Sequence, residues 1–501
     1  MVLDAVIVGA GFSGLCAGIQ LRKAGIESFV ILEKADGVGG TWRDNTYPGA
    51  ACDIPSHLYS YSFEPNPTWS RAYGGQREIL AYLERCAESY GLAPHLRFHQ
   101  RVTAARYDAA TATWSVTTEG GERFVAKTLI LGNGALHVPA VPELPGIETF
   151  TGTAFHSARW RHDHDVTNKR VAVIGTGASA IQFVPEIAPK VRSLTVFQRT
   201  PPWVVPKPDR PVGKRERWLL EKVPGAHWLR RTGLYWLLES RVLAFAFSPR
   251  IQQYAEKLAR GHLDHQVRDP ALRDRLRPDY RLGCKRVLIS NDYYPALQRP
   301  NVELVTDRIT RVEPQGVRTA DGRLHEVDTI IYGTGFRVVD YLASIEITGR
   351  DGVDLNAVWQ QSVRNYLGIT VSGFPNMFLL MGPNTGLGHN SMVFMIDAQV
   401  RYAVSAIRRM QQQALASIEV RPEVEQAFRA EMTRRLGATV WTSGCNSWYM
   451  APDGDVLLWP GFTFDYWRRT RQIDLRDFTV ESRDAVTLPR ADLTLDLGAT
   501  V

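Results

Sequence analysis

Two stretches of the chain share the same order of apolar runs and glycine turns. Residues 4–33 open with the apolar run AVIV, pass through a glycine turn, continue as a helix to about Lys23 and end in the run FVILE. Residues 170–199 repeat this order with VAVI, a second glycine turn, a helix to about Ile187 and the run LTVFQ. A strand, a glycine turn, a helix and a second strand within about 30 residues form a βαβ unit. The pattern therefore predicts two such units in one chain.

Outside these units, the spacing of apolar residues predicts further elements. Helical spacing predicts a helix over 76–90, and alternation predicts strands over 102–107, 114–117, 128–131, 302–305 and 329–332. The polar, helical stretch 209–283 predicts an inserted helical subdomain. We expect an α/β fold with two Rossmann-like dinucleotide-binding domains and this helical insertion. The first domain is predicted to be discontinuous, over 1–142 and 340–501, and the second is assigned to 150–208 and 284–335.

Composition and charge narrow the class of protein. The 501 residues are 44% hydrophobic and 22% charged, which is ordinary for a soluble protein with large cores. The net charge is +7 without a run of five Lys or Arg, which suits anionic cofactors better than nucleic acid. The five cysteines are widely spaced and form no CxxC or CxxxxC pair. This spacing argues against a disulfide framework, a zinc site and the dithiol centre of a disulfide reductase, so no metal is predicted.

Two further features concern location. The first apolar run, Ala5–Val8, begins too early to leave room for a signal peptide. The most membrane-like stretch, Gly233–Phe247, contains Glu239 and Arg241 and is shorter than the roughly 20 apolar residues that span a bilayer. We therefore predict a cytoplasmic protein without a membrane partner.

The glycine turns are candidate dinucleotide sites. In such turns the first two glycines allow a tight bend and close approach of a pyrophosphate, and the third small residue lets the helix and strand pack. The start of the following helix supplies free N–H groups and a partial positive charge. We assign to the first site Gly9, Gly11, Phe12, Ser13 and Gly14, and to the second Gly175, Thr176, Gly177, Ala178, Ser179 and Ala180.

The residue that ends the second strand of each unit indicates which nucleotide binds there. Glu33 and Arg199 lie at the same distance along the chain from the first glycine of their turns. A carboxylate accepts hydrogen bonds from ribose hydroxyls, whereas a guanidinium matches a 2′-phosphate. The first site should therefore hold FAD or NAD and the second NADPH. Two such sites in one chain suggest hydride transfer from NADPH to FAD, so the residues by themselves indicate an NADPH-dependent flavoprotein.

Several segments resemble the Baeyer–Villiger monooxygenases, which depend on FAD and NADPH. The resemblance runs from residue 2 to about 470, through the segments GGTW at 39–42, YPGAACD at 47–53, QRTP at 198–201, GCKR at 283–286 and YGTGF at 332–336. The family fingerprint is matched by Phe150, Gly152, His156 and Trp160. The chain departs from the family at Ala180, the third small residue of the second turn, and at Gly333, where Ala is common.

The resemblance implies a reaction and roles for individual residues. NADPH would reduce FAD, dioxygen would form a peroxyflavin, and one oxygen atom would be inserted next to a ketone carbonyl to give an ester or lactone. Arg286 would be the catalytic cation that stabilises the anions, held by Asp53. His156 and Trp160 would act on conformation. Further FAD contacts would come from Lys34, Gly40, Thr41, Trp42, Tyr47, Cys52, Asp53, Tyr59, Val102 and Gly335, and further NADPH contacts from Thr200, Lys285, Arg286 and Trp448.

Two alternatives and two open questions accompany this assignment. A flavin-dependent N- or S-hydroxylating monooxygenase would share both nucleotide sites but would not need Arg286 and Asp53. A non-catalytic redox sensor is an alternative of a different class. The ketone and the choice between monomer and homodimer stay open. The tryptophans without an assigned role are predicted to be core residues.

Overall fold

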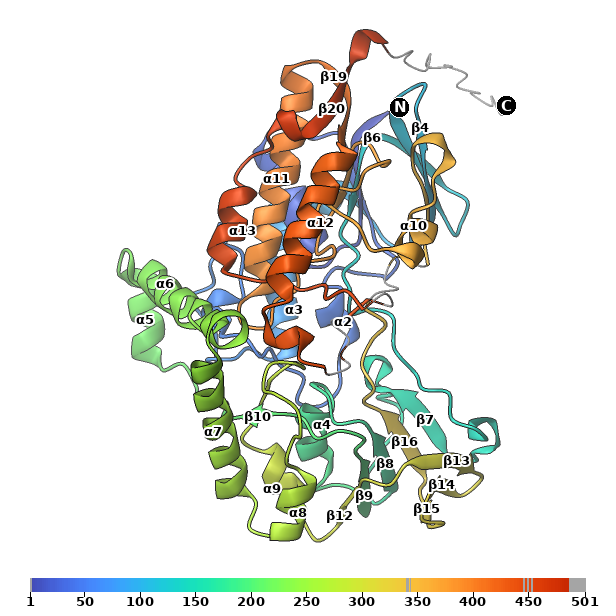
Figure 1. Cartoon of the computed structure of the whole chain (residues 1–501), viewed down its shortest axis with the longest axis vertical. Helices are drawn as coiled ribbons and strands as arrows, with labels where there is room; N and C mark the ends of the chain where they lie inside the picture. The colour runs from blue at the N-terminus through green and yellow to red at the C-terminus, as the bar shows by residue number, and fades with distance from the viewer. Residues whose placement is uncertain are drawn as a thin grey trace, which may run out of the picture.

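A mixed sheet of eight strands carries the first glycine turn (Figure 1). The computed structural model describes residues 2–338, 342, 344–444, 447, 450–451 and 454–485. The strand order is β17-β4-β5-β6-β1-β2-β3, and β18 also pairs with β6. These strands are β1 (Leu3–Val8), β2 (Phe29–Leu32), β3 (Leu96–Arg97), β4 (Val102–Asp108), β5 (Thr113–Thr118), β6 (Arg123–Leu131), β17 (Glu346–Thr348) and β18 (Met377–Leu379). Strands from the first 131 residues and from residues 346–379 thus share one sheet.

A parallel sheet of five strands carries the second glycine turn, in the order β12-β9-β8-β16-β7. Its members are β7 (Thr153–His156), β8 (Arg170–Ile174), β9 (Ser193–Phe197), β12 (Val302–Val305) and β16 (Thr329–Tyr332). Between β12 and β16 the chain forms an antiparallel sheet of β13 (Ile309–Glu313), β14 (Gly316–Thr319) and β15 (Leu324–Glu326). A separate, two-stranded parallel sheet is formed by β10 (Val204–Val205) and β11 (Leu288–Ile289).

The central parallel strands β1 and β8 are buried on both faces, which explains their continuous apolar runs. In β1, Ala5 and Ile7 belong to one hydrophobic core and Val6 and Val8 to another on the opposite face of the sheet. The strand β8 divides its side chains between two cores in the same way. Side chains that alternate between faces can all be apolar only when both faces are covered, as they are here.

Helices provide this cover. On the first sheet they are α1 (Phe12–Lys23), α2 (Thr41–Asp44), α3 (Gln76–Ser89), α10 (Leu355–Gln361), α11 (Met392–Gln412), α12 (Pro422–Leu436) and α13 (Thr463–Arg469), together with the antiparallel pair of β19 (Leu415–Val420) and β20 (Phe478–Ser482). On the second sheet they are α4 (Ala180–Ile187) and α9 (Tyr293–Leu297). The predicted helix over 76–90 is confirmed as α3, and all five predicted strands are confirmed as β4, β5, β6, β12 and β16.

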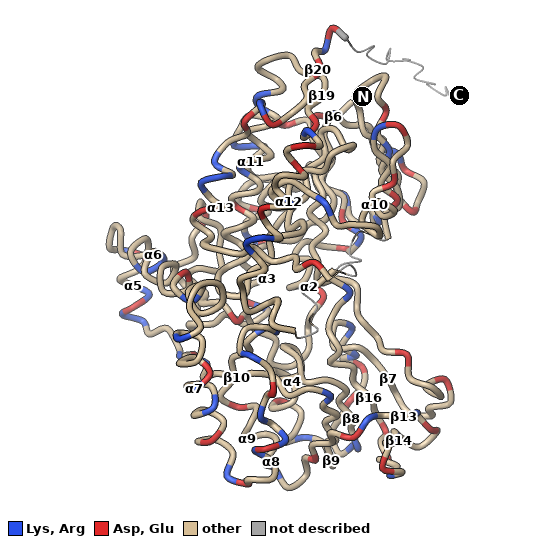
Figure 2. Tube along the Cα trace, in the orientation of Figure 1, with Lys and Arg blue, Asp and Glu red and all other residues tan. Residues whose placement is uncertain are grey.

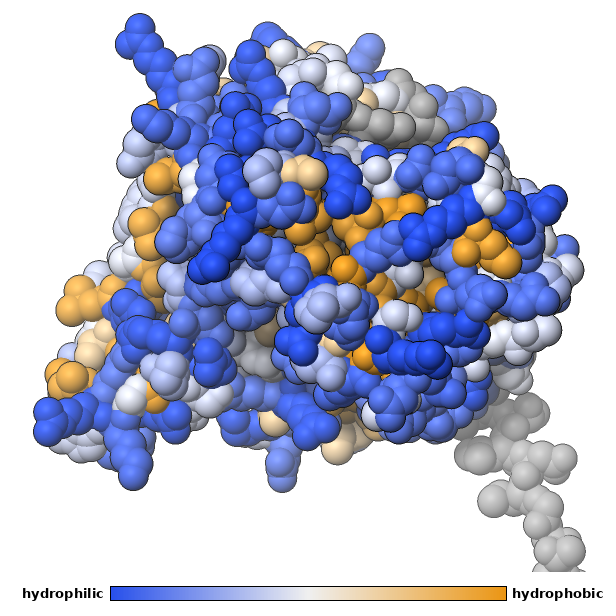
Figure 3. Space-filling model, turned by 90° about the horizontal axis from the view of Figure 1, so that it is seen from below, coloured by the Kyte–Doolittle hydropathy of each residue, from blue (hydrophilic) through white to orange (hydrophobic). Residues whose placement is uncertain are grey.

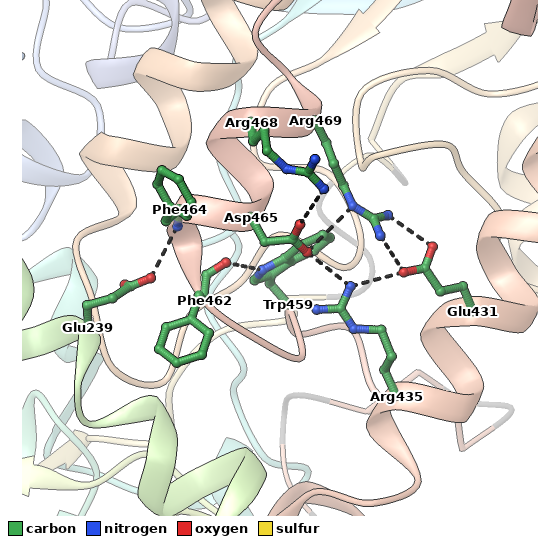
Figure 4. Close-up of polar contacts among 9 residues, drawn as sticks. All are labelled: Glu239, Glu431, Arg435, Trp459, Phe462, Phe464, Asp465, Arg468 and Arg469. Carbon is green, nitrogen blue, oxygen red and sulfur yellow. Dashed lines mark hydrogen bonds and ion pairs between the residues drawn. The ribbon is translucent and has the colours of Figure 1, made fainter.

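The stretch 209–283, for which a helical insertion is predicted, contains α5 (Lys214–Lys222), α6 (Ala226–Glu239), α7 (Pro249–Gln266) and α8 (Pro270–Arg275). In Figure 1 it forms the green part of the chain, with α5 and α6 projecting to the left. The buried carboxylate of Glu239 fastens the end of α6 by accepting the Phe464 N–H at 3.1 Å (Figure 4). In the same figure Asp465 and Glu431 join α13 to α12 through Arg435 and Arg469.

Two expectations about side chains are corrected. Trp218, Trp228 and Trp236 lie exposed on α5 and α6, so the core prediction is wrong for them. Cys284 is disulfide-bonded, which the spacing argument did not predict, because spacing along the chain does not show which cysteines the fold brings together. Within the described ranges, none of the helices has the length and apolar character to cross a membrane.

Candidate active site

The first glycine turn is shaped by close backbone contacts. Gly9 has a φ of +94°, and a Cβ there would lie 2.9 Å from the Gly132 carbonyl oxygen. A Cβ on Gly14 would lie 1.8 Å from the Gly9 carbonyl oxygen, so only glycine lets α1 start this close to β1. Gly11 faces more open space, because a Cβ there would lie 3.6 Å from its nearest neighbour, the Gly40 Cα. The turn is therefore a cradle that leaves backbone N–H groups at the start of α1 free to approach a pyrophosphate.

Glu33 is anchored at this turn. Its buried carboxylate accepts hydrogen bonds from the Ala10 N–H at 2.7 Å and the Ala35 N–H at 2.9 Å. These bonds fix the carboxylate at the end of β2, beside the glycines, where the sequence places the ribose. Lys34 is half-buried, and this burial lowers the pKa of its ammonium group. Val102 is buried at the start of β4.

An aromatic wall beside the first turn is formed by Phe12, Trp42 and Tyr59. The Trp42 indole donates to the Tyr59 hydroxyl at 3.0 Å, and their rings meet edge to face. Phe12 packs edge to face against Tyr59 from the start of α1. Burial raises the pKa of the Tyr59 hydroxyl and of the Cys52 thiol, which keeps both groups neutral. These residues form a rigid, uncharged surface.

The second glycine turn has the same shape. Gly175 has a φ of +105°, and a Cβ there would lie 2.5 Å from the Gly333 carbonyl oxygen. Ala180 occupies the third small position, and a Cβ on Gly333 would lie 3.1 Å from the Ala180 Cβ. The positions of two departures from the family pattern are thus neighbours. Ala180 has a methyl group where the family pattern has glycine, and this methyl group faces Gly333, which lacks the methyl group of the common alanine.

Two cations gather beside the second turn. Arg199 lies two residues after the end of β9 and is exposed. The pKa of Lys285 is lowered first by burial and then by the nearby charge of Arg199. The Lys285 ammonium also lies 4.9 Å from the centre of the Tyr280 ring. Neither cation forms an ion pair with any described residue. Thr200 lies beside them, and its carbonyl accepts the Thr176 hydroxyl at 3.4 Å. Neighbouring cations without an anion suit a phosphate group.

A cavity of about 1230 Å³ joins the two halves of the site, the first around the turn 9–14 and the second around the turn 175–180. It is lined from the first half by Thr41, Trp42 and Asp53 and from the second by Thr176, Arg199 and Arg286. Gly9, Gly11, Gly14, Glu33 and Val102 do not line it. The cavity therefore reaches both the aromatic wall and the two neighbouring cations, Arg199 and Lys285.

Arg286 and Asp53 meet inside this cavity. The Arg286 Nε and Nη2 atoms lie 3.1 and 2.5 Å from one carboxylate oxygen of Asp53, and Nη1 donates to the Leu387 carbonyl at 3.0 Å. Three contacts fix the guanidinium in place, while about a quarter of the side chain stays accessible. The structure thus brings together two residues that are 233 positions apart in the sequence.

The fingerprint residues lie at the edge of the second sheet. A Cβ on Gly152 would lie 2.4 Å from the Asp328 carbonyl oxygen, which explains the glycine. The buried His156 accepts the Ala158 N–H at Nδ1 and packs against Phe336, and burial lowers the pKa of its imidazole, which keeps the ring neutral. Trp160 packs against Phe155 and Phe183, and Phe150 lies beside the core of β13 and β14. These contacts are structural ones within the second half.

Other predicted residues have clear positions. Gly40 has a φ of +52°, and a Cβ there would lie 3.1 Å from the Gly11 Cα. Gly335 lines the cavity with a φ of +81°, and its carbonyl accepts the Ala140 N–H. Ser13 is buried in the first turn of α1, and Gly177, Ala178 and Ser179 line the cavity. Trp448 lies outside the described residues.

Sequence reasoning missed Gln182, which joins the two halves. From α4 its amide accepts the Tyr47 hydroxyl at 2.9 Å and donates to the Ala51 carbonyl at 2.9 Å. A Cβ on Gly49 would lie 2.7 Å from the Gln182 carbonyl oxygen, so the loop is pressed against α4. No motif of the sequence marks this glutamine. It connects the segment YPGAACD with the second nucleotide turn.

The arrangement defines a class of protein: an oxidoreductase with two dinucleotide sites that open toward one cavity. Residues 6–214 match the family described as pyridine nucleotide-disulphide oxidoreductase. A Baeyer–Villiger monooxygenase of Pseudomonas aeruginosa is 47% identical, covering 93% of this chain and 89% of the relative. One of Streptomyces coelicolor is 44% identical, with coverage of 98% and 96%. A crystal structure of OTEMO in complex with FAD and NADP is 29% identical with a TM-score of 0.87, covering 95% of this chain and 99% of the other.

The chain belongs to the Baeyer–Villiger monooxygenase family. It is an FAD-containing, NADPH-dependent monooxygenase that inserts an oxygen atom next to a ketone carbonyl. The predicted function is confirmed at this level, and the comparisons give no support to the hydroxylase or the redox sensor.

Proposed function

We propose that Arg286 is the catalytic residue of ketone oxygenation in this chain and that Asp53 is its positioning residue. When bound, reduced FAD activates dioxygen and delivers one oxygen atom, and NADPH supplies the hydride. The first turn and Glu33 fit the adenosine end of FAD, because the glycine cradle admits a pyrophosphate and the carboxylate suits a ribose. Residues 1–142 and 340–501 would make up this FAD domain, residues 150–208 and 284–335 the NADPH domain, and residues 209–283 the helical insertion.

The pairing of Arg286 with Asp53 inside the cavity is the observation that carries the proposal. While the ketone carbon is attacked, negative charge grows on the carbonyl oxygen, and a fixed guanidinium stabilises that charge without reorganising. Asp53 and the Leu387 carbonyl hold three nitrogens of the group, so little motion is left to it. Only about a quarter of the Arg286 side chain is accessible, and this partial burial makes its electrostatic interactions stronger than they would be in bulk water.

The remaining assigned residues would hold NADPH and connect the two halves. Arg199 and Lys285 would bind the 2′-phosphate, with the donors of the turn 175–180 on the pyrophosphate. His156 and Trp160 would stabilise the chain between the halves. The substrate would be a small-molecule ketone, whether aryl, cyclic or long-chain, that enters the same cavity together with dioxygen.

The test compares two reactions of the purified holoenzyme. Arg286→Ala should reduce ester formation by about 10²–10³, the usual loss of one electrostatic donor, while FAD reduction by NADPH continues. Arg286→Lys should also fail, because an ammonium group does not reproduce the contacts of the guanidinium. Product mass detection over a panel of ketones and sulfides measures the first reaction, and flavin absorbance measures the second. Ester formation by the Ala variant at the wild-type rate would refute the role.

A further inference from the structure

An apolar face is exposed on the helical insertion. Of the fifteen large hydrophobic side chains that are exposed in the described chain, eleven lie within residues 218–258. The most prominent are on α5 and α6: Trp218, Leu219, Trp228, Leu229, Trp236 and Leu237, with Trp228 65% exposed. Figure 3 shows hydrophobic side chains gathered along its left edge, where α5 and α6 project in Figure 1. A concentration of this kind marks an interaction surface.

The opposite face of α6 is firmly attached to the molecule. Arg231 donates to the His57 carbonyl, the Ser60 hydroxyl and the Ser60 carbonyl, each at 3.0 Å. Glu239, at the end of the helix, is buried and accepts the Thr463 hydroxyl at 2.7 Å. The helix is therefore held in a defined orientation, and its exposed aromatic side chains belong to a rigid surface.

This surface is surrounded by positive charge. Residues 214–260 carry ten Lys or Arg, one of which is Arg231 on the attached face, against four Glu and no Asp. Among those four, Glu239 is buried and Glu216 binds Arg210 at 2.6 Å. Lys214 and Arg215 are exposed and make no ion pair with any described residue. Figure 2 shows Lys and Arg along both α5 and α7.

We propose that α5 and α6 dock on the surface of a membrane that contains anionic lipids. Trp and Leu on one face, with Lys and Arg around them, is the composition of helices that lie in the interface of a bilayer. A second copy of the chain is a poorer partner, because pairing would bring two positive surfaces together. Anionic headgroups instead neutralise the charge and attract each basic residue near the surface. The docking is peripheral, so the hydropathy criterion used on the sequence, which detects spans, did not find it.

The test is flotation of the FAD-loaded, full-length protein with vesicles. Vesicles of phosphatidylcholine with phosphatidylglycerol should bind the protein, and vesicles of pure phosphatidylcholine should bind it at least about tenfold more weakly. Leu229→Ser should weaken binding by about tenfold, since it removes an apolar side chain that would enter the interface. Arg215→Glu should weaken binding to the anionic vesicles by roughly tenfold as well.

Val480→Ser is the matched control, because Val480 is also exposed but lies on β20, away from the insertion. It should bind vesicles like the wild type, and all variants should keep their FAD. A second measurement uses fluorescence quenching. Lipids with brominated acyl chains should quench the tryptophan emission of the wild type more than that of the double variant Trp228→Phe/Trp236→Phe. The proposal is overturned if the wild type does not float with anionic vesicles. It is also overturned if Leu229→Ser acts only by abolishing self-association, which would identify a second copy as the partner.

Discussion

Replacement of Arg199 by alanine tests the assignment of the second nucleotide site. Arg199 and Lys285 are two cations without an anion partner among the described residues, and a charge-assisted contact contributes about 1.5–3 kcal/mol. Two contacts would give a preference for NADPH over NADH of roughly 10²–10⁴, and the exposure of Arg199 places the expected value near 10²–10³. Arg199→Ala should therefore raise the KM for NADPH by about tenfold or more and leave the KM for NADH nearly unchanged.

The assay is steady-state kinetics with both nucleotides and a ketone that the enzyme accepts. The loss should lie in KM, because the 2′-phosphate is remote from the hydride and is bound equally in the ground and transition states. Arg192→Ala is the control, since Arg192 is also exposed but precedes β9 at the opposite end of the strand. Equal use of NADH and NADPH by the wild type would refute the reasoning, as would equal effects of the two variants.

Three further predictions concern neighbouring groups. Asp53→Ala should slow oxygenation while FAD stays bound, because Arg286 is no longer held in place, as followed by stopped-flow absorbance; loss of FAD alone would indicate a structural turn. Burial and Arg199 lower the pKa of Lys285, so its protonated form, which binds phosphate, is lost at a lower pH than that of an ordinary lysine. The KM for NADPH should accordingly rise as the pH increases, and Arg199→Ala should move this rise to higher pH; a rise at the same pH would contradict the coupling. Gly152→Ala should lower the stability by about 1–3 kcal/mol in thermal unfolding, because its Cβ would overlap the Asp328 carbonyl oxygen; an unchanged melting temperature would show that the backbone relaxes.

The elements that could be predicted from the sequence are those set by local pattern. The two βαβ units follow from apolar runs and glycines within 30 residues, and the strands β4 and β12 follow from alternation alone. The pairing of Arg286 with Asp53 has a different origin, because no local rule connects residues this far apart. It was predicted from the resemblance of two short segments to one family.

Other features depend on how distant segments pack and have no local signal. Gln182 looks like any polar residue of a helix, and its three bonds to the loop 47–51 exist only because α4 lies against that loop. The tryptophans of α5 and α6 show the reverse case. Their residue type is typical of cores, and only the arrangement of the insertion leaves them in solvent.

The contact between Ala180 and Gly333 makes each position conditional on the other. Adding a methyl group at Gly333 places two Cβ atoms 3.1 Å apart, closer than carbon atoms prefer, whereas the same methyl group opposite a glycine at 180 meets no such obstacle. The two sites should therefore covary among relatives, with one alanine shared between them. A sequence that moved from one arrangement to the other would pass through a state with either a crowded contact or an empty space. The most common residue of the family at one of these positions is thus a poor guide to substitution here. Residues 180 and 333 have to be substituted together.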